Sequence, residues 1–185
     1  MYSTFSPRYV LILLLLSTCF TWALANSTPP LRVVIIRHGE KPEKGHYLSC
    51  QGQNRAAALP AILHQKFGNP DYTYVPKMGS NKKTMGSRMY QTAAPFANQY
   101  KLSLNTNFEE TDFSGIAADI LKKKGTVLLV WEHSAIKGIT KALGVSEPGK
   151  WSGEDFDSIW IISFDNGKAV LHKDHEGLHP STACQ

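Results

Sequence analysis

Residues 31–40 read LRVVIIRHGE, and this stretch decides the fold. Its first six residues form a short, nearly continuous apolar run with β-branched side chains, which is typical of a buried strand in a parallel sheet. A second run of this kind, TVLLVW at residues 126–131, predicts another central strand. Helical and turn-rich segments separate the two runs, so the sequence predicts an α/β fold.

Further helices and strands alternate along the chain. The expected helices cover residues 52–67 (with Ser49 as the cap), 88–100, 113–124 and 135–143, and the other strands cover 72–75, 159–164 and 169–172. Asn166-Gly167 between the last two strands is typical of a tight hairpin turn. We therefore expect a three-layer sandwich, with a mostly parallel central sheet, helices on both faces and a C-terminal hairpin. It should form a single domain over residues 31–175, followed by a C-terminal tail at 176–185.

Composition and charge narrow the class of protein. Hydrophobic residues make up 42% and charged residues 19% of the 185, so the chain can bury a core and is not of the disordered class. The formal net charge of +5 comes without a long Lys/Arg run, which favours a small anionic partner over nucleic acid. The oligomeric state does not follow from the sequence.

The first 25 residues have the organisation of a secretory signal peptide. Arg8 precedes an unbroken apolar run at residues 10–16, and an ALA triplet ends at Ala25, after which we expect cleavage. The apolar run is too short to span a bilayer comfortably, so we expect no membrane span after cleavage and a secreted or periplasmic location. An uncleaved anchor and lipidation at Cys19 are the alternatives.

Cleavage would leave two cysteines, Cys50 and Cys184. In an oxidising compartment they could pair, which would attach the C-terminus to the loop around Cys50. Two free thiols are the alternative, and the sequence does not decide between them.

The predicted strands place chemically active side chains at one edge of the sheet. Arg37 and His38 follow the first central strand and His133 follows the second, and open α/β sheets bind ligands at the carboxyl ends of their strands. Arg88 opens a helix, whose backbone N–H groups favour an anion. Guanidinium groups grip phosphate oxygens in pairs, a neutral imidazole nitrogen can attack phosphorus, and Gly39 would let phosphate approach the backbone.

Four segments, taken in order, resemble the histidine phosphatase superfamily, which includes phosphoglycerate mutases and acid phosphatases. They are Arg37-His38-Gly39, LSCQGQNRA at residues 48–56, RMYQTA at residues 88–93, and His133 at the end of a hydrophobic strand. The resemblance covers residues 33 to about 140. It implies the fold of this family and a reaction that needs no metal or other cofactor.

The resemblance also implies a role for each matching residue. His38 would be the nucleophile and form a phosphohistidine, which water then hydrolyses. Arg37, Arg88 and His133 would hold the phosphoryl oxygens, and Gly39 would line the substrate site. These implied roles agree with the general demand of phosphoryl transfer for positioning and charge stabilisation.

The resemblance points to more than one residue for the general acid. In the mutase-like branch it is a Glu after the second Arg, which here points to Glu110 or Glu109. In the acid phosphatase branch it follows the second His, where this chain has Ser134. We expect Glu110, with Glu109 and Glu132 as alternatives, because neighbouring strand residues such as Glu132 and His133 point to opposite faces.

The sequence therefore predicts an exported histidine phosphatase acting on a phosphomonoester. Few residues separate the predicted core elements, so there is no room for a large helical cap, and we expect a fairly open site. A phosphomutase of the same family, a non-catalytic phosphate-binding module and a metallohydrolase using His38 and His133 are the alternatives. The physiological substrate does not follow from the sequence.

Overall fold

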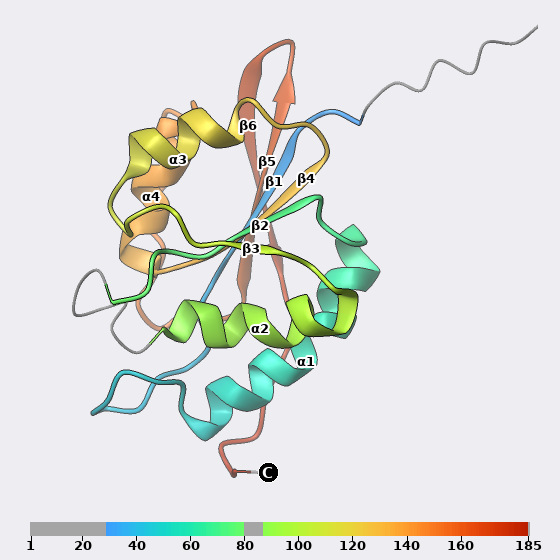
Figure 1. Cartoon of the computed structure of the whole chain (residues 1–185). Coiled ribbons are helices and arrows are strands. Elements are labelled where there is room, and N and C mark those ends of the chain that lie inside the picture. Colours follow the sequence, from blue (N-terminus) through green and yellow to red (C-terminus); the bar gives the residue numbers. More distant parts are fainter. Residues whose placement is uncertain (1–28, 80–86, 185) are drawn as a thin grey trace, which may run out of the picture.

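The computed structural model describes residues 29–79 and 87–184, which form three layers around one six-stranded sheet (Figure 1). The elements are β1 (Arg32–Arg37), α1 (Cys50–Phe67), β2 (Tyr72–Tyr74), α2 (Arg88–Tyr100), β3 (Leu104–Asn105), α3 (Phe113–Ile120), β4 (Thr126–Trp131), α4 (His133–Ala142), β5 (Ser158–Asp165) and β6 (Lys168–His175). The predicted α/β sandwich is confirmed.

The sheet has the strand order β3-β2-β4-β1-β5-β6. At its centre β1 and β4 pair in parallel, from Arg32 opposite Thr126 to Arg37 opposite Trp131. β2 and β3 continue the parallel part, whereas β5 runs antiparallel to β1 and forms a hairpin with β6. Positive φ angles at both turn residues of the hairpin, Asn166 and Gly167, fit the turn that their sequence predicts.

The two central strands bury side chains on both faces, which explains their continuous apolar runs. Val33 and Ile35 pack in one cluster with residues of α3 and α4, whereas Val34 and Ile36 pack in a second cluster with residues of α1 and α2. Figure 1 shows these two helix pairs on opposite sides of the sheet.

Some boundaries differ from the predicted ones. α3 ends at Ile120 instead of residue 124, because the next N–H groups bond only three residues back, from Lys122 to Asp119 and from Lys123 to Ile120. β3 has two residues and was not predicted, since so short a strand has no periodicity to detect. α4 starts at His133, two residues earlier than expected, and this shift changes the site.

The expected signal peptide, its cleavage after Ala25 and the lipidation alternative at Cys19 lie outside the described residues. Within residues 29–79 and 87–184, none of the helices combines the length and the apolar character needed to cross a membrane.

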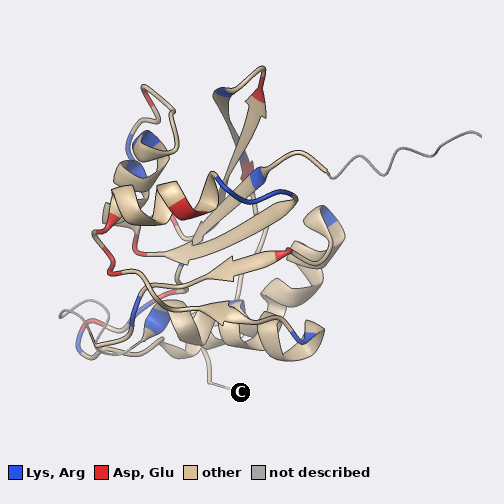
Figure 2. Cartoon of the chain, turned by 45° about the horizontal axis from the view of Figure 1, so that its top comes forward, with Lys and Arg blue, Asp and Glu red and all other residues tan. Residues whose placement is uncertain are grey.

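Charged residues are spread over many elements of the fold. Figure 2 shows Lys and Arg on helices, strands and connecting loops, with Asp and Glu among them. Within the described residues, positive and negative side chains are therefore interspersed (Figure 2).

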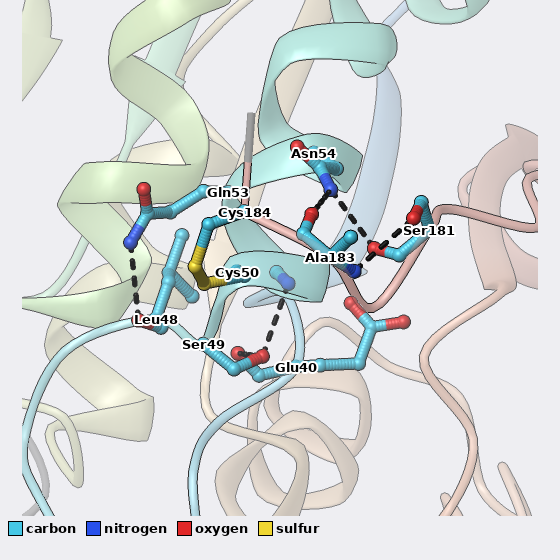
Figure 3. Close-up of a disulfide and its surroundings, with 10 residues drawn as sticks. Glu40, Leu48, Ser49, Cys50, Gln53, Asn54, Ser181, Ala183 and Cys184 are labelled. Atoms are coloured by element: carbon cyan, nitrogen blue, oxygen red, sulfur yellow. Dashed lines mark hydrogen bonds between the residues drawn. A yellow bond between two sulfur atoms is a disulfide. The ribbon is translucent and has the colours of Figure 1, made fainter.

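The chain after β6 folds back onto the start of α1, where a disulfide joins Cys50 and Cys184 (Figure 3). One turn along the helix, Asn54 Nδ2 donates hydrogen bonds to the carbonyl oxygens of Ser181 at 2.9 Å and Ala183 at 2.8 Å. Of the two alternatives for the cysteines, the structure has the paired one. The expected C-terminal tail is therefore held against α1.

Replacing both Cys50 and Cys184 with Ser should lower the free energy of unfolding by about 2–4 kcal/mol. The bridge joins residues 134 positions apart and so restricts the unfolded chain strongly. Urea titration of oxidised wild type, reduced wild type and the double variant measures the difference. Reduced wild type should match the variant, and equal stability of all three proteins would contradict the prediction.

Candidate active site

The carboxyl ends of β1 and β4 bring the two predicted histidines to the same edge of the sheet. β1 ends at Arg37, and the backbone N–H of the next residue, His38, donates to the Trp131 carbonyl at 3.1 Å. β4 ends at Trp131, Glu132 is the N-cap of α4, and His133 is the first residue of that helix. Each histidine thus lies within two residues of the end of its strand, and the two strands are paired.

One carboxylate, that of Glu132, lies between the two histidines. Its Oε2 is 3.1 Å from His38 Nε2, its Oε1 contacts His133 Nδ1, and Arg88 Nη2 lies 3.8 Å from Oε2. The expectation that Glu132 and His133 point apart is therefore wrong. β4 ends at Trp131, so the alternation of strand side chains does not extend to these two residues.

Arg37 is buried beside this carboxylate and holds the loop before β5. Its Nη1 donates to the carbonyl oxygens of Gly153 at 2.7 Å and Asp155 at 3.1 Å, and its Nη2 lies 3.2 Å from His133 Nδ1. The guanidinium carbon is 3.8 Å from the centre of the Phe156 ring, a cation–π contact. Burial lowers the pKa of Arg37 to about 10, so the group stays charged at neutral pH.

The ring of His38 is completely buried and has a partner at each nitrogen. Nδ1 lies 2.6 Å from the Gly39 carbonyl oxygen, which can only accept, so Nδ1 carries a proton. Nε2 faces the Glu132 carboxylate and is the nitrogen left for chemistry. This carboxylate covers Nε2 itself, and the openness of the wider site stays a prediction.

The positive surroundings keep Glu132 ionised. Burial pushes its pKa upward, but the hydrogen bond with His38 and the positive charges around it outweigh burial and lower the pKa to about 2. Burial, together with the charge of Arg37, lowers the pKa of His133 below its usual value. The cage of two arginines and two histidines is therefore built to hold an anion.

Comparison with known proteins bears on the fold. No family model matches the sequence, and no curated protein matches it. Among solved structures, the protein histidine phosphatase SixA complexed with tungstate is 14% identical, with a TM-score of 0.55 over 78% of this chain and 97% of that one.

Two further structures have different activities. A mycobacterial glucosyl-3-phosphoglycerate phosphatase in complex with inorganic phosphate is 15% identical, with a TM-score of 0.54 over 77% of this chain and 95% of that one. A phosphoglycerate mutase from Bacillus anthracis is 15% identical, with a TM-score of 0.52 over 80% of this chain and 93% of that one.

The chain has the histidine phosphatase fold. The resemblance of four short segments predicted this fold, and the structures confirm it. At 14–15% sequence identity, these comparisons show a shared fold only. What this member of the fold can do chemically therefore has to come from its own side chains.

Within the histidine phosphatase fold, hydrogen bonds connect the predicted motif segments to one another. Thr92 Oγ1 in α2 accepts from the Gly39 N–H at 2.9 Å, and Gln91 Oε1 accepts from the Leu48 N–H at 3.0 Å. The RMYQTA segment thus supports both the loop after β1 and the loop that leads into α1. Arg88 enters the site from the first position of α2.

Gly39 has a packing role that the sequence did not indicate. A Cβ atom on Gly39 would lie 2.8 Å from the backbone oxygen of Gly52, and one on Gly52 would clash with the backbone of Glu40. The loop after β1 therefore crosses the start of α1 backbone to backbone, which only glycine permits. Contact between Gly39 and a phosphoryl group stays a prediction.

Arg55 links this loop to the C-terminal segment. It is buried, and its Nε and Nη2 donate to the Glu40 carboxylate at 2.8–3.1 Å, while its Nη1 donates to Glu176 Oε2 at 2.5 Å. Burial and the charges of Asp157 and Glu40 raise the pKa of Glu176 to about 8, against the effect of Arg55. Arg55 contacts no reacting group and supports the loop that follows His38.

The three candidate acids lie in different surroundings. Glu110 is buried, and its backbone carbonyl accepts from the Trp131 indole N–H at 2.9 Å. Glu109 is half exposed and pairs with Lys77 at 3.2 Å. Glu132 contacts both histidines, which makes it a strong candidate, and the role of Glu110 as general acid stays a prediction.

Sequence reasoning missed the partners of Arg37. The carbonyls of Gly153 and Asp155 and the ring of Phe156 lie more than 110 positions away along the chain. Backbone carbonyls leave no trace in a sequence, so no local pattern could have found them.

Metal binding has no obvious place in the part of the chain that the structure describes. Over residues 29–79 and 87–184, no three His, Cys, Asp or Glu side chains gather in a way that could hold an ion. The donors at the site, with two guanidinium groups among them, suit an oxyanion.

Proposed function

We propose that this protein is an exported phosphatase that hydrolyses a phosphomonoester through a phosphohistidine on His38. The observation that carries the proposal is the cage in which Arg37, Arg88, His38 and His133 surround a single carboxylate, that of Glu132. Phosphoryl transfer depends mostly on positioning and on stabilising negative charge, and this cage supplies both.

The hydrogen bonds of His38 suit a nucleophile. The Gly39 carbonyl keeps a proton on Nδ1, so in the neutral ring the lone pair lies on Nε2, which attacks phosphorus. Arg37, Arg88 and His133 hold the phosphoryl oxygens. The buried Nε of Arg37 has no hydrogen-bond partner among the described residues and is a donor that a phosphoryl oxygen can use.

Two observations support export. The N-terminal sequence has the organisation of a signal peptide, and the described part of the chain contains a disulfide between Cys50 and Cys184. Disulfides persist in secreted and periplasmic proteins and are rare in the cytosol.

Hydrolysis of p-nitrophenyl phosphate by the purified protein in excess chelator tests the activity. Acid-labile, base-stable label on the protein after brief exposure to a labelled ester would identify the phosphohistidine. Activity that is lost in chelator would point to a metallohydrolase. Label that moves to a phosphorylated acceptor instead of water would point to a mutase. Phosphate binding with neither turnover nor label would point to a binding module.

Replacing Arg88 with Met should lower kcat/KM for p-nitrophenyl phosphate by about 10²–10³-fold, because one charged donor to the transition state is lost. Lys122→Met is the matched control, since it removes the same charge from an exposed position at the end of α3. Steady-state kinetics of both variants measures the effect, and similar kcat/KM values for the two would speak against a role for Arg88.

A further inference from the structure

Glu132 stands where the proposed phosphoryl group has to bind. Its Oε2 contacts His38 and lies 3.8 Å from Arg88, its Oε1 contacts His133, and the residue is only 4% exposed. A phosphoryl group must take over these contacts. The Glu132 side chain therefore has to give up its place, its charge or both when substrate enters.

The carboxylate is not needed for helix capping. Glu132 is the N-cap of α4, a position whose side chain commonly accepts from the first N–H groups of the helix. The Glu132 side chain makes no such hydrogen bond. Its oxygens are instead directed at the imidazole rings, so this acidic side chain serves the site and not the helix.

One proton is shared between His38 and Glu132. The Nδ1–H of His38 donates to the Gly39 carbonyl. An ionised Glu132 can only accept, so Nε2 is the donor across the 3.1 Å contact. A protonated Nε2 has no lone pair and cannot attack phosphorus. The nearest acceptor that could free it is the same Glu132 carboxylate.

We propose that Glu132 is the general acid of this reaction, receiving the proton of His38 Nε2 as substrate binds and passing it to the leaving oxygen. The assignment rests on the proposed phosphatase function. The negative charge of the phosphoryl group makes an ionised neighbour in a buried site unfavourable, which drives the proton onto Glu132. A single transfer thus prepares both the nucleophile and the acid.

The steps balance in protons and electrons. The Nε2 lone pair forms the N–P bond, the P–O bond to the leaving group breaks, and the alkoxide takes the proton of Glu132 and departs as an alcohol. The Glu132 carboxylate then accepts a proton from water, whose oxygen bonds to phosphorus while the N–P electrons return to Nε2. Hydrogen phosphate leaves, and His38 Nε2 and Glu132 together hold one proton again.

The test compares two esters in the Glu132→Gln variant, which keeps the size of the side chain but removes its proton chemistry. The neutral Gln amide can donate to His38 Nε2, so the ring can keep its Nε2 lone pair without a proton transfer to residue 132. An alkyl phosphate needs a proton on its leaving oxygen, whereas p-nitrophenyl phosphate has a leaving group that departs without one. We expect kcat/KM to fall by about 10²–10⁴-fold for the alkyl ester and by less than about tenfold for the aryl ester. Phosphohistidine should still form from the aryl ester.

Three outcomes would overturn the assignment. They are an equal loss on both esters, no loss on either, and the selective loss in Glu110→Gln but not in Glu132→Gln. In Glu132→Asp the side chain is one carbon shorter. This variant should also lose more kcat/KM on the alkyl ester than on the aryl ester, by a smaller factor, and it replaces the Gln variant in the test if that variant does not fold. Failure of the phosphatase function itself looks different, because wild type would then turn over neither ester and form no phosphohistidine.

Discussion

Replacing His38 with Asn should reduce phosphatase activity by about 10⁴-fold or more, as expected when a covalent nucleophile is removed. The amide nitrogen of Asn can take the position of Nδ1 and donate to the Gly39 carbonyl, so the loop after β1 keeps its hydrogen bond. No group replaces Nε2. The variant should therefore lack both turnover and phosphohistidine label while its circular dichroism stays that of wild type.

The matched control is His172→Asn, because His172 is an exposed histidine of β6. It should keep the activity of wild type in the same assay. If His38→Asn retains more than a tenth of the wild-type rate, or still acquires acid-labile label, His38 is not the nucleophile.

Replacing Arg55 with Met should lower the free energy of unfolding by about 3–5 kcal/mol and the melting temperature by roughly 6–20 °C. Arg55 is 4% exposed and donates hydrogen bonds to two buried acidic side chains, those of Glu40 and Glu176. Methionine fills much of the same volume but leaves both carboxylates without their cation. Thermal and urea unfolding of the variant and wild type measure the loss.

The loss should depend on pH. Burial raises the pKa of Glu176 to about 8 even with Arg55 present, and removal of Arg55 raises it further. A group whose pKa is higher in the folded state adds stability below its unfolded value, near 4.5, and loses it as the pH rises. Glu176 is therefore largely protonated in both folded proteins below pH 8. Its part of the difference between the variant and wild type should be small there and should grow as the pH rises above 8.

A surface pair provides the control for Arg55. Lys66 and Asp174 form an ion pair at 2.8 Å in which both side chains are at least one-third exposed. Lys66→Met should change the stability by no more than about 1 kcal/mol. An Arg55→Met variant as stable as Lys66→Met would show that the buried network does not stabilise the fold.

Local patterns in the sequence predicted most of the fold. The continuous apolar runs of β1 and β4 marked two strands buried on both faces, and Asn166-Gly167 marked the final hairpin. These features depend on residues that are close together in the sequence, so a local sequence pattern can predict them. β3 could not, because its two residues are held by pairing with β2.

For the site, the sequence by itself determined which residue types stand at the ends of β1 and β4 and at the start of α2. It placed His38 and His133 at one edge because parallel strands end there together, and it indicated Arg88 as the start of a helix. Only the tertiary structure decided that Glu132 turns inward between the histidines, because that depends on where β4 ends and α4 begins. It also decided that Cys50 and Cys184 pair, since a contact across 134 positions is set by packing and not by local sequence.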